Sequence, residues 1–338
     1  MAGLDFFDQV VHLQRQYART QTVIGNSLQT NGTLITKEWA AFFKKNEFLI
    51  GVSLDGTQQI HDSRRVYSNG TGSFNQVMRG IQHEQQVEFN ILTVVHEGNV
   101  DKAAEMLNFY AEHGFNYIQF IPCMDFRAQQ PDKPPQFLIT SKQYGQFLCD
   151  VFDIWFNDGN PVISERFFDN LFRLHVGYPA ESCIHRDSCP KTLILEQNGD
   201  AYPCDFFMNS NYKLGNVGTD SLDDILSNPQ YDQFLRLKPT LPDSCQSCQY
   251  LKFCHGGCPR NRRWSAGDGG VLPDVFCESY KMIYQYSYER MEQIAVKWRK
   301  ERTEEWIARG RKLPGRNDLC LCGSGRKYKK CCEDIVAH

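Results

Sequence analysis

The placement of the cysteines constrains this chain more than any other feature of its sequence. There are 14 cysteines in 338 residues, none precedes Cys123, and most lie between Cys183 and Cys332. Many are separated by two to five intervening residues, a spacing typical of metal-binding thiolates rather than of a disulfide framework. The sequence begins without the charged and apolar regions of a secretory signal peptide, and thiols in a reducing cytoplasm stay free for metal. We therefore expect a cytoplasmic metal-binding protein, with a secreted disulfide protein as the disfavoured alternative.

The spacing divides the cysteines into three groups. Eight lie between residues 183 and 277, four lie at the C-terminus, and Cys123 and Cys149 stand apart. Eight thiolates suffice for two sets of four, and both a cubane iron–sulfur cluster and a zinc ion take four, so the count alone leaves the metal open. Cys149 follows apolar residues in a predicted helix and is expected to be a small buried residue. Cys123 follows a predicted strand and is open between a core thiol and a site residue.

The first 125 residues alternate between predicted strands and helices. Apolar runs near 22–32, 48–54, 87–95 and 117–122 predict strands, and amphipathic segments at 36–46, 73–84 and 100–113 predict helices between them. This rhythm predicts βαβ units and a parallel sheet. Ligands bind at the carboxyl ends of such strands, which places Gln29, Asn31, Ser53, Asp55 and Cys123 near any active site. Taken singly, each is also explained as an ordinary turn residue.

The rest of the chain divides into a linker, a cysteine-rich part and a basic tail. A Pro-rich linker is expected at 126–140, helices at 142–157, 164–176 and 221–237, a hairpin at 192–202, and a long helix at 278–300. Residues 297–332 hold 12 Lys or Arg against 4 Asp or Glu. We expect three parts, at 1–140, 141–295 and 296–338.

The layout of the eight cysteines resembles the SPASM domain of radical S-adenosylmethionine (SAM) enzymes. The pattern is C-x5-C-x14-C at 183–204, then C-x2-C-x5-C-x3-C at 245–258, then Cys277. Within that group the chain is most similar to the anaerobic sulfatase-maturating enzymes, over roughly residues 1–290. The supporting segments are NSLQTNG at 26–32, SLDG at 53–56, IQFI at 118–121, YPCDF at 202–206 and LGN at 214–216.

The resemblance implies a fold and an activity. The fold is α/β: a partial (β/α) radical SAM barrel lacking its first strands, then a cysteine-rich SPASM domain and a small zinc module. Such enzymes oxidise a Cys or Ser of a sulfatase to Cα-formylglycine without oxygen. A 5′-deoxyadenosyl radical removes a Cβ hydrogen, and two auxiliary [4Fe–4S] clusters help carry the released electron away. The implied partners are an unfolded or nascent sulfatase polypeptide and an electron donor such as ferredoxin or flavodoxin. Neither a membrane nor nucleic acid is expected.

The sequence departs from the family pattern at one point. Radical SAM enzymes carry a C-x3-C-x2-C loop for the cluster that cleaves SAM, and these 338 residues contain neither that triplet nor a Gly-Gly-Glu-Pro segment. We therefore expect a chain without the family's N-terminal portion. On this view SAM and a third [4Fe–4S] cluster belong only to the full-length form, and the chain alone is inactive.

The resemblance also assigns residues. Asp205 matches the family's proposed general base, which would accept the proton that oxidation of the substrate releases; a structural aspartate at a hairpin end is the alternative. Ser53 and Arg65 match SAM-contacting positions, with Gln29 and Asn31 as further candidates, and a guanidinium suits the methionine carboxylate. One cluster is assigned to a first set of ligands, Cys183, Cys189, Cys204 and Cys258, and the other to a second set, Cys245, Cys248, Cys254 and Cys277.

The C-terminal segment 314–332 resembles the SEC-C zinc motif almost residue for residue. Cys320, Cys322, Cys331 and Cys332 would close a tetrahedral structural zinc site, in a fold small enough to need its metal. The surrounding basic residues are open between a binding surface for protein or nucleic acid and a solvated face that offsets the charge of the thiolates.

Three functions follow from these observations. The first is an anaerobic sulfatase maturase, favoured by Asp205 in its Pro-Cys-Asp context. The second is a SPASM-type radical SAM enzyme that modifies another peptide. The third is a non-catalytic protein that binds metal clusters, which the missing triplet favours.

Overall fold

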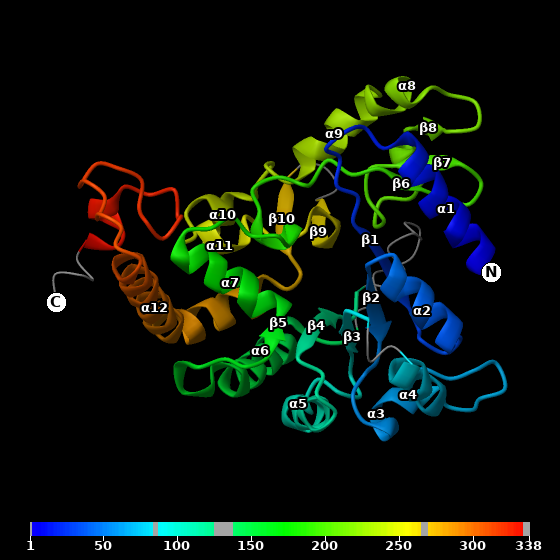
Figure 1. Ribbon diagram of the computed structural model, residues 1–338, viewed down its shortest axis with the longest axis horizontal. Coiled ribbons are helices and arrows are strands. Elements are labelled where there is room, and N and C mark those ends of the chain that lie inside the picture. Colours follow the sequence, from blue (N-terminus) through cyan, green and yellow to red (C-terminus); the bar gives the residue numbers. More distant parts are fainter. Residues whose placement is uncertain (1, 84–86, 125–137, 265–269, 334–338) are drawn as a thin grey trace. The chain divides into compact units, whose positions relative to one another are not determined.

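The computed structural model describes residues 2–83, 87–124, 138–264 and 270–333. The chain forms two compact units, which Figure 1 colours from blue to red along the sequence. Most of the predicted linker at 126–140 lies outside the described residues. Unit 1 comprises Met1–Cys123 and Val162–Arg166, and unit 2 comprises Met124–Pro161 and Phe167–His338.

Unit 1 is built on a parallel sheet whose five strands follow the chain order β1-β2-β3-β4-β5. The α/β class and the parallel sheet that the sequence predicts are confirmed. Because all five strands run the same way, their carboxyl ends lie along one edge (Figure 1). The strands are β1 (Asn26–Thr30), β2 (Phe48–Ser53), β3 (Phe89–Val95), β4 (Tyr117–Pro122) and β5 (Ser164–Glu165).

Helices connect the strands of unit 1 and cover their apolar side chains. Ile50 and Val52 of β2 are fully buried, as expected for a strand packed on both faces, but Leu49 is 46% exposed. The helix predicted from residue 164 begins two residues later, because Ser164 and Glu165 pair with β4 instead. The helices of unit 1 are α1 (Leu4–Tyr17), α2 (Lys37–Lys45), α3 (Gln58–Asp62), α4 (Phe74–His83) and α5 (Ala103–Glu112).

Unit 2 contains a helical layer in which α6 (Ser141–Phe156) packs along α12 (Cys277–Ala308). A capping box starts α6, since Thr140 Oγ1 accepts from the backbone N–H of Gln143 and the Gln143 side chain accepts from that of Thr140. Phe147, Phe152 and Ile283 are fully buried in this layer. The helix α7 (Arg166–Val176) belongs to the same part of the chain, and α12 extends eight residues beyond the predicted end at 300.

The cysteine-rich part of unit 2 consists of short elements. The predicted hairpin is present as β6 (Ile194–Leu195) and β7 (Asp200–Tyr202), with Gly199 in the left-handed region at φ 86°, and β8 (Gly215–Asn216) adds a third strand. The helix predicted over 221–237 is two helices, α8 (Leu222–Leu226) and α9 (Pro229–Leu237), because Asn228 caps a new helix whose first residue is a proline. The remaining elements are α10 (Asp243–Gln246), α11 (Leu251–Cys254), β9 (Arg262–Trp264) and β10 (Val271–Asp274).

The contact between α4 and the turn after β1 gives a test of the packing in unit 1. A Cβ added to Gly80 would lie 2.1 Å from the carbonyl oxygen of Gly32. Alanine is the better helix former by about 1 kcal/mol, but overpacking costs about 1–3 kcal/mol. Gly80→Ala should therefore lower the unfolding midpoint measured by calorimetry. Gly25, whose Cβ would meet open space, is the control. An equal effect of Gly25→Ala would contradict this account.

Candidate functional site

The carboxyl edge of the sheet in unit 1 carries a buried ion pair. Asp55 follows β2 and is 2% exposed. Its Oδ2 accepts from Arg65 Nε at 2.5 Å and its Oδ1 from Arg65 Nη2 at 3.0 Å. The backbone N–H of Val94 on β3 also donates to Oδ1, at 2.9 Å. This bidentate pair fixes the loop that follows β2 to the neighbouring strand, and two of the five N–H donors of Arg65 are committed to it.

A buried histidine extends this network. His61 Nδ1 accepts from the backbone N–H of Asp55 at 3.2 Å, and Nε2 lies 3.0 Å from Ser73 Oγ. An accepting Nδ1 assigns the ring hydrogen to Nε2, which donates to Ser73. Ser73 Oγ in turn donates to the carbonyl oxygen of Arg65. Burial lowers the pKa of His61 to about 4, so the ring is neutral at pH 7 and works as a spacer between the ion pair and α4.

The residues assigned to SAM lie at or near this edge. Ser53 ends β2 and is half-buried, and Gln29 and Asn31, at the end of β1, are exposed. Asn31 Oδ1 accepts from the backbone N–H and the hydroxyl of Thr33, which makes it a turn-forming residue. The four residues that the sequence analysis assigns to SAM thus lie at or near the carboxyl edge of the sheet. The structure adds that Arg65 is held there by Asp55.

Two further groups lie at the ends of neighbouring strands. His96, directly after β3, is 3% exposed; its Nδ1 accepts from the backbone N–H of Gly98. Its Nε2 has no hydrogen-bond partner among the described residues, and burial lowers its pKa. Cys123, directly after β4, is 4% exposed, and burial raises its pKa. The burial of Cys123 favours the core-thiol interpretation. Cys149 is buried within α6, as predicted.

The first set of cysteines surrounds the small sheet of unit 2. Cys189 and Cys204 pack against the apolar cluster that includes Ala201 and Phe234. Burial raises the pKa of Cys204 to about 12 and that of Cys258 to about 11. Charge on Cys258 adds to the shift of Cys204, and charge on Cys183 adds to those of Cys189 and Cys258. The four thiols are therefore electrostatic neighbours.

The second set lines one cavity. Its four thiols border about 400 Å³ of empty space, partly open to solvent, together with Gly257, Asp274 and Tyr284. Burial raises the pKa of Cys277 to about 11, and charges on the other three members raise it further. Burial also raises the pKa of Cys254, with charges on Cys245 and Cys248 next to it. In each such pair both cysteines belong to the same set, which is the partition that the family resemblance implies.

Asp205 lies next to the first set. Its Oδ1 accepts a hydrogen bond from the thiol of Cys204 at 3.3 Å, and its side chain is exposed. The thiol hydrogen occupies the position that a metal would take on this sulfur, because metal ligands are thiolates. Loss of that hydrogen would leave the carboxylate oxygen free for another donor.

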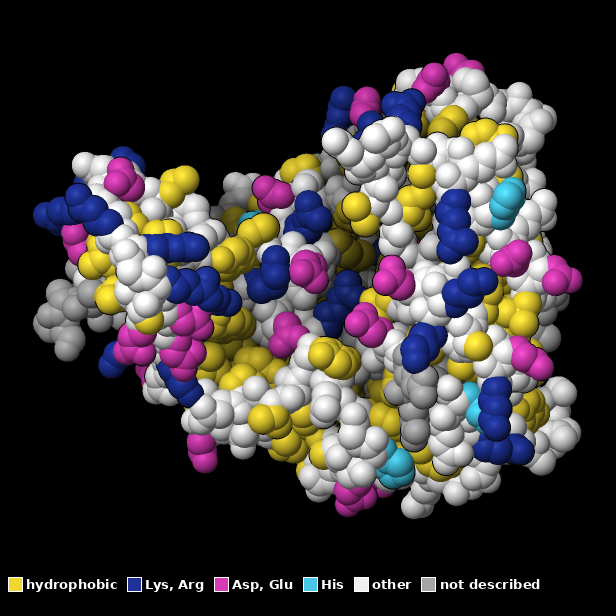
Figure 2. Space-filling view, in the orientation of Figure 1, with side chains coloured by type: hydrophobic (Ala, Val, Ile, Leu, Met, Phe, Trp, Pro, Cys, Tyr) yellow, Lys and Arg dark blue, Asp and Glu magenta, His cyan; other side chains and the backbone are white. Residues whose placement is uncertain are grey.

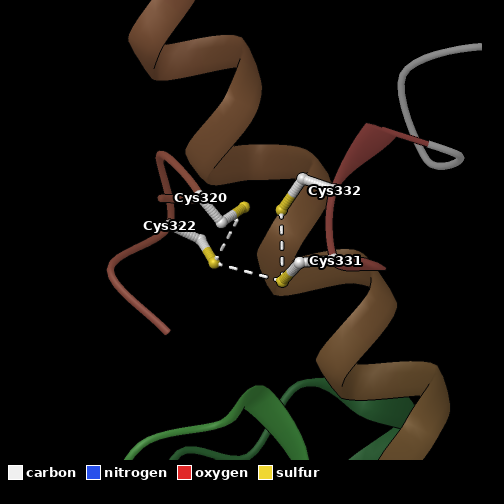
Figure 3. Close-up of side chains that lie close together, drawn as sticks. All are labelled: Cys320, Cys322, Cys331 and Cys332. Atoms are coloured by element: carbon white, nitrogen blue, oxygen red, sulfur yellow. Dashed lines mark hydrogen bonds between the residues drawn. The ribbon is translucent and has the colours of Figure 1, made fainter. Parts of the chain in front are cut away.

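The four C-terminal cysteines form a compact quartet. Their sulfurs all lie within 4.8 Å of one another, and Figure 3 shows them facing a common centre. The Sγ atom of Cys322 is 3.5 Å from those of Cys320 and Cys331. Hydrogen bonds with Cys331 and Cys332 lower the pKa of Cys322, and hydrogen bonds with Cys322 and Cys331 raise the pKa of Cys332. Burial raises the pKa of Cys320 to about 11. One metal ion that replaces these hydrogens would satisfy all four sulfurs.

The quartet is docked onto the helices of unit 2. Tyr178 donates from its hydroxyl to the carbonyl oxygen of Cys322 at 2.5 Å, and Arg326 Nη2 donates to that of Val176 at 3.3 Å. Trp298 of α12 packs against the cysteines. Figure 2 shows Lys and Arg side chains gathered around the end of α12 and the segment after it, beside Asp and Glu. On this face, the basic tail of the sequence therefore presents side chains of both charge signs.

Comparison with known families identifies two modules. The SPASM family, described as an iron–sulfur cluster-binding domain, matches residues 188–249. The SEC-C motif matches residues 316–334. The first match contains four cysteines of the two sets, Cys189, Cys204, Cys245 and Cys248, and the second contains the whole C-terminal quartet. The chain is therefore an iron–sulfur protein with a SPASM domain and a SEC-C motif.

Curated relatives and solved structures identify the family. The cysteine-type anaerobic sulfatase-maturating enzyme of Clostridium novyi (strain NT) is 32% identical over 299 residues, which are 87% of this chain and 79% of that enzyme. The serine-type enzyme of Bacteroides thetaiotaomicron is 33% identical over 302 residues, 85% of this chain and 73% of that enzyme. The solved structure "Native anSMEcpe with bound AdoMet and Kp18Cys peptide" matches with a TM-score of 0.81 and 33% identity, over 88% of this chain and 82% of that one.

These likenesses establish that the chain belongs to the anaerobic sulfatase-maturating enzymes, which are radical SAM oxidoreductases. The resemblance drawn from the cysteine layout is thus confirmed. Among the described residues, no helix is both long and apolar enough to cross a membrane.

Several residues of the site escape sequence reasoning. Asp55 is expected at the sheet edge from its position after β2, but nothing in the sequence predicts its pairing with Arg65. Lys238 and Arg262 are buried beside the cysteines, and a lone Lys or Arg in a sequence is normally a surface residue. The one available signal is indirect, since Arg262 lies only four residues after Cys258.

The burial of His61 predicts a specific pH dependence. Its pKa falls from about 6.5 in the unfolded chain to about 4 in the folded one, so the unfolded chain binds more protons between these values and stability is lost as pH falls. Between pH 7.5 and pH 5, His61 should cost unit 1 about 2 kcal/mol. His61→Asn, which keeps an acceptor for Asp55, should remove this part of the dependence in urea unfolding. The exposed His12 gives the control His12→Asn. A His61→Asn variant with the wild-type pH dependence would contradict the account.

Proposed function

We propose that the chain has the function of an anaerobic sulfatase maturase, which oxidises a Cys or Ser of a sulfatase polypeptide to Cα-formylglycine in a form that includes a C-x3-C-x2-C loop. The observation that carries this proposal is the hydrogen bond between Asp205 and Cys204. It joins an exposed carboxylate, accessible to a polypeptide, to a member of the first set of cysteines. Membership of the family supports the substrate class, and one solved relative has a bound Kp18Cys peptide.

The two sets of cysteines are proposed to hold two auxiliary [4Fe–4S] clusters. The donor set fits, because each cluster takes four thiolates and the cysteine charges that raise the pKa of Cys277 and of Cys258 come from members of their own sets. The cavity between the members of the second set is wider than the C-terminal quartet, whose sulfurs suit a single ion. When bound, the clusters supply acceptors for the electron that leaves the substrate. The thiols must lose their hydrogens for binding, so loading weakens as pH falls.

Asp205 is proposed to be the general base. Oxidation of the substrate side chain leaves a proton on its sulfur or oxygen, and a carboxylate within hydrogen-bond reach can accept it. With Cys204 as a thiolate ligand, the carboxylate no longer receives the thiol hydrogen and is free for the substrate. The exposure of its side chain and its contact with Cys204 favour the catalytic interpretation over a structural aspartate at the hairpin end.

The edge of the sheet in unit 1 is proposed to contact SAM through Ser53, Arg65, Gln29 and Asn31. Arg65 fits the methionine carboxylate, because Asp55 orients its guanidinium and leaves it with further N–H donors. When bound with its cluster, SAM supplies the one-electron chemistry that removes a hydrogen from the substrate. The third [4Fe–4S] cluster is proposed only for a form that includes a C-x3-C-x2-C loop.

The SEC-C quartet is proposed to hold one structural Zn²⁺. It would tie the segment after α12 to the rest of unit 2 through the contacts of Tyr178 and Arg326. We further propose that the chain divides into parts at 1–140, 141–295 and 296–338. The proposed partners are a nascent or unfolded sulfatase polypeptide and a ferredoxin or flavodoxin. The proposed location is the cytoplasm.

A non-catalytic cluster-binding function is the second candidate, and the absence of the C-x3-C-x2-C triplet from these 338 residues favours it. We expect the 338-residue chain, loaded with iron and sulfide, not to form 5′-deoxyadenosine from SAM under reducing conditions. Formation of 5′-deoxyadenosine would show that this expectation is wrong, and aldehyde formation in a sulfatase peptide would then test the activity directly.

Metal content tests the assignment of ligands. After anaerobic loading, the chain should bind about eight irons and about one zinc. Cys277→Ala should remove about four irons and keep the zinc, whereas Cys322→Ala should remove only the zinc. Cys149→Ala, which changes a buried thiol outside both sets, is the control. Loss of all iron in Cys277→Ala with a normal circular dichroism spectrum would contradict two independent clusters.

The role of Asp205 is testable in a fusion of this chain to the C-x3-C-x2-C segment of a sulfatase-maturating relative. Asp205→Asn should lower aldehyde formation in a sulfatase peptide about 10²–10⁴-fold, while 5′-deoxyadenosine formation continues. Asp187→Asn changes an exposed aspartate near Cys189 and should leave the rate unchanged. Equal rates for Asp205→Asn and Asp187→Asn would assign Asp205 a structural role.

A further inference from the structure

Two cations of unit 2 are buried beside the cysteines, although Lys and Arg are almost never fully buried without a partner. Lys238, directly after α9, is 1% exposed, and Arg262, the first residue of β9, is 4% exposed. Neither forms an ion pair with a carboxylate of the described residues. Cations of unit 2 that do include Arg173, Lys213, Arg290, Arg299, Arg302 and Arg316.

Both cations donate to backbone carbonyl oxygens around the cysteines. Lys238 Nζ donates to the carbonyls of Ile184 and Gly257, which directly adjoin Cys183 and Cys258 in the chain. Arg262 donates to five carbonyl oxygens, those of Leu237, Lys238, Thr240, His255 and Gly256. Carbonyl dipoles satisfy the N–H donors, but they do not cancel a buried charge, which stays costly until an anion is present.

One buried carboxylate lies in the same region. Asp274 is 4% exposed and accepts from the backbone N–H groups of Cys258 and Phe276, at 2.9 Å and 2.8 Å. Two buried cations against one buried carboxylate leave an excess of positive charge beside the cysteines. Four thiolates around a [4Fe–4S] core carry a net negative charge, so a bound cluster supplies the anion that the described residues lack.

The two cations differ in which set they adjoin. Burial lowers the pKa of Lys238, and the charges of Cys258, Cys183 and Cys189, all members of the first set, oppose that shift. The neighbours of Arg262 include Cys245 of the second set as well as Cys258. Lys238 therefore adjoins mainly the first set, although its charge also acts on Cys254 of the second set, whereas Arg262 lies between the two.

We propose that Lys238 is the buried counter-cation of the cluster held by the first set, and that its charge raises the reduction potential of that cluster. The inference rests on the proposed assignment of the first set to a cluster. A positive charge in a low-dielectric region stabilises the added electron of the reduced state, and charge and burial are two of the factors that set the potential of such clusters. Lys238 touches no substrate and acts through the cluster, as a positioning residue. Its charge makes the first cluster a better electron acceptor than the same cluster would be without Lys238.

The experiment is a potentiometric titration of the anaerobically loaded full chain, followed by electron paramagnetic resonance. Cys277→Ala, which removes the second cluster, identifies the signal of the first. Lys238→Met removes the charge at similar length, Lys238→Gln removes it and keeps an N–H donor, and Lys238→Arg keeps the charge. Lys191→Met is the matched control, because it removes an exposed lysine two residues from Cys189, where water screens the charge.

The expected result is a shift of the first cluster's midpoint potential to more negative values in Lys238→Met and Lys238→Gln. The second cluster should change less, and Lys238→Arg and Lys191→Met should stay near the wild type. Loss of half of the iron in both neutral variants, with full loading of Lys238→Arg, would also support the counter-cation. Unchanged potentials in the neutral variants, an equal shift in Lys238→Arg, or neutral variants that are insoluble in both metal-free and loaded form would overturn the proposal.

The wild-type chain separates this inference from the proposed function. If it takes up no iron or shows no cluster signal, the cluster assignment is wrong, and the variants then contain no cluster whose potential could be measured. If it loads both clusters and the potentials ignore the charge at position 238, the assignment holds and only the role of Lys238 is wrong.

Discussion

The burial of sulfur charge is the constraint on which unit 2 depends. Its cysteine-rich part is made of strands of two to four residues and mostly short helices, with one small apolar cluster around Ala201 and Phe234. Burial raises the pKa of several of its thiols, so without metal these groups stay protonated and contribute little. If these thiolates bind metal as proposed, they become crosslinks between segments far apart in sequence, such as those of Cys204 and Cys258. The free energy of metal binding then becomes free energy of folding.

In unit 1, polar groups are held at the edge of an apolar sheet. Asp55, Arg65 and His61 form one hydrogen-bonded network that joins the loop after β2 to β3 and to α4. Because Arg65 donates to both carboxylate oxygens of Asp55, the orientation of its guanidinium is fixed, and so is the direction of its remaining N–H donors. A rigid guanidinium is what recognition of a carboxylate requires. Unit 1 thus has a polar sheet edge that is already ordered by hydrogen bonds, whereas the proposed sites of unit 2 depend on metal.

The sequence predicts the parts of this structure that depend on local pattern. Apolar runs such as Phe48–Ser53 predict the parallel strands, and cysteine spacing predicts the SPASM and SEC-C modules, which family matches confirm. It misses what depends on long-range pairing: Ser164 and Glu165 look helical but add a strand to β4, and Pro229 divides a predicted helix. The sequence also does not predict that Lys238 and Arg262 are buried, because only the folded chain shows which cations lie beside the thiols. The assignment of Cys258 to the first set is implied only by the family resemblance and stays a prediction, since spacing alone groups it with Cys245, Cys248 and Cys254.

The most direct test of the account is a crystal structure of the anaerobically loaded chain with an anomalous difference map at the iron absorption edge. The account predicts two separate iron peaks. One is surrounded by Cys183, Cys189, Cys204 and Cys258, with the Nζ atom of Lys238 nearby, and the other by Cys245, Cys248, Cys254 and Cys277. A single peak held by the four cysteines between residues 245 and 258, with Cys183, Cys189 and Cys204 free of iron, would contradict it.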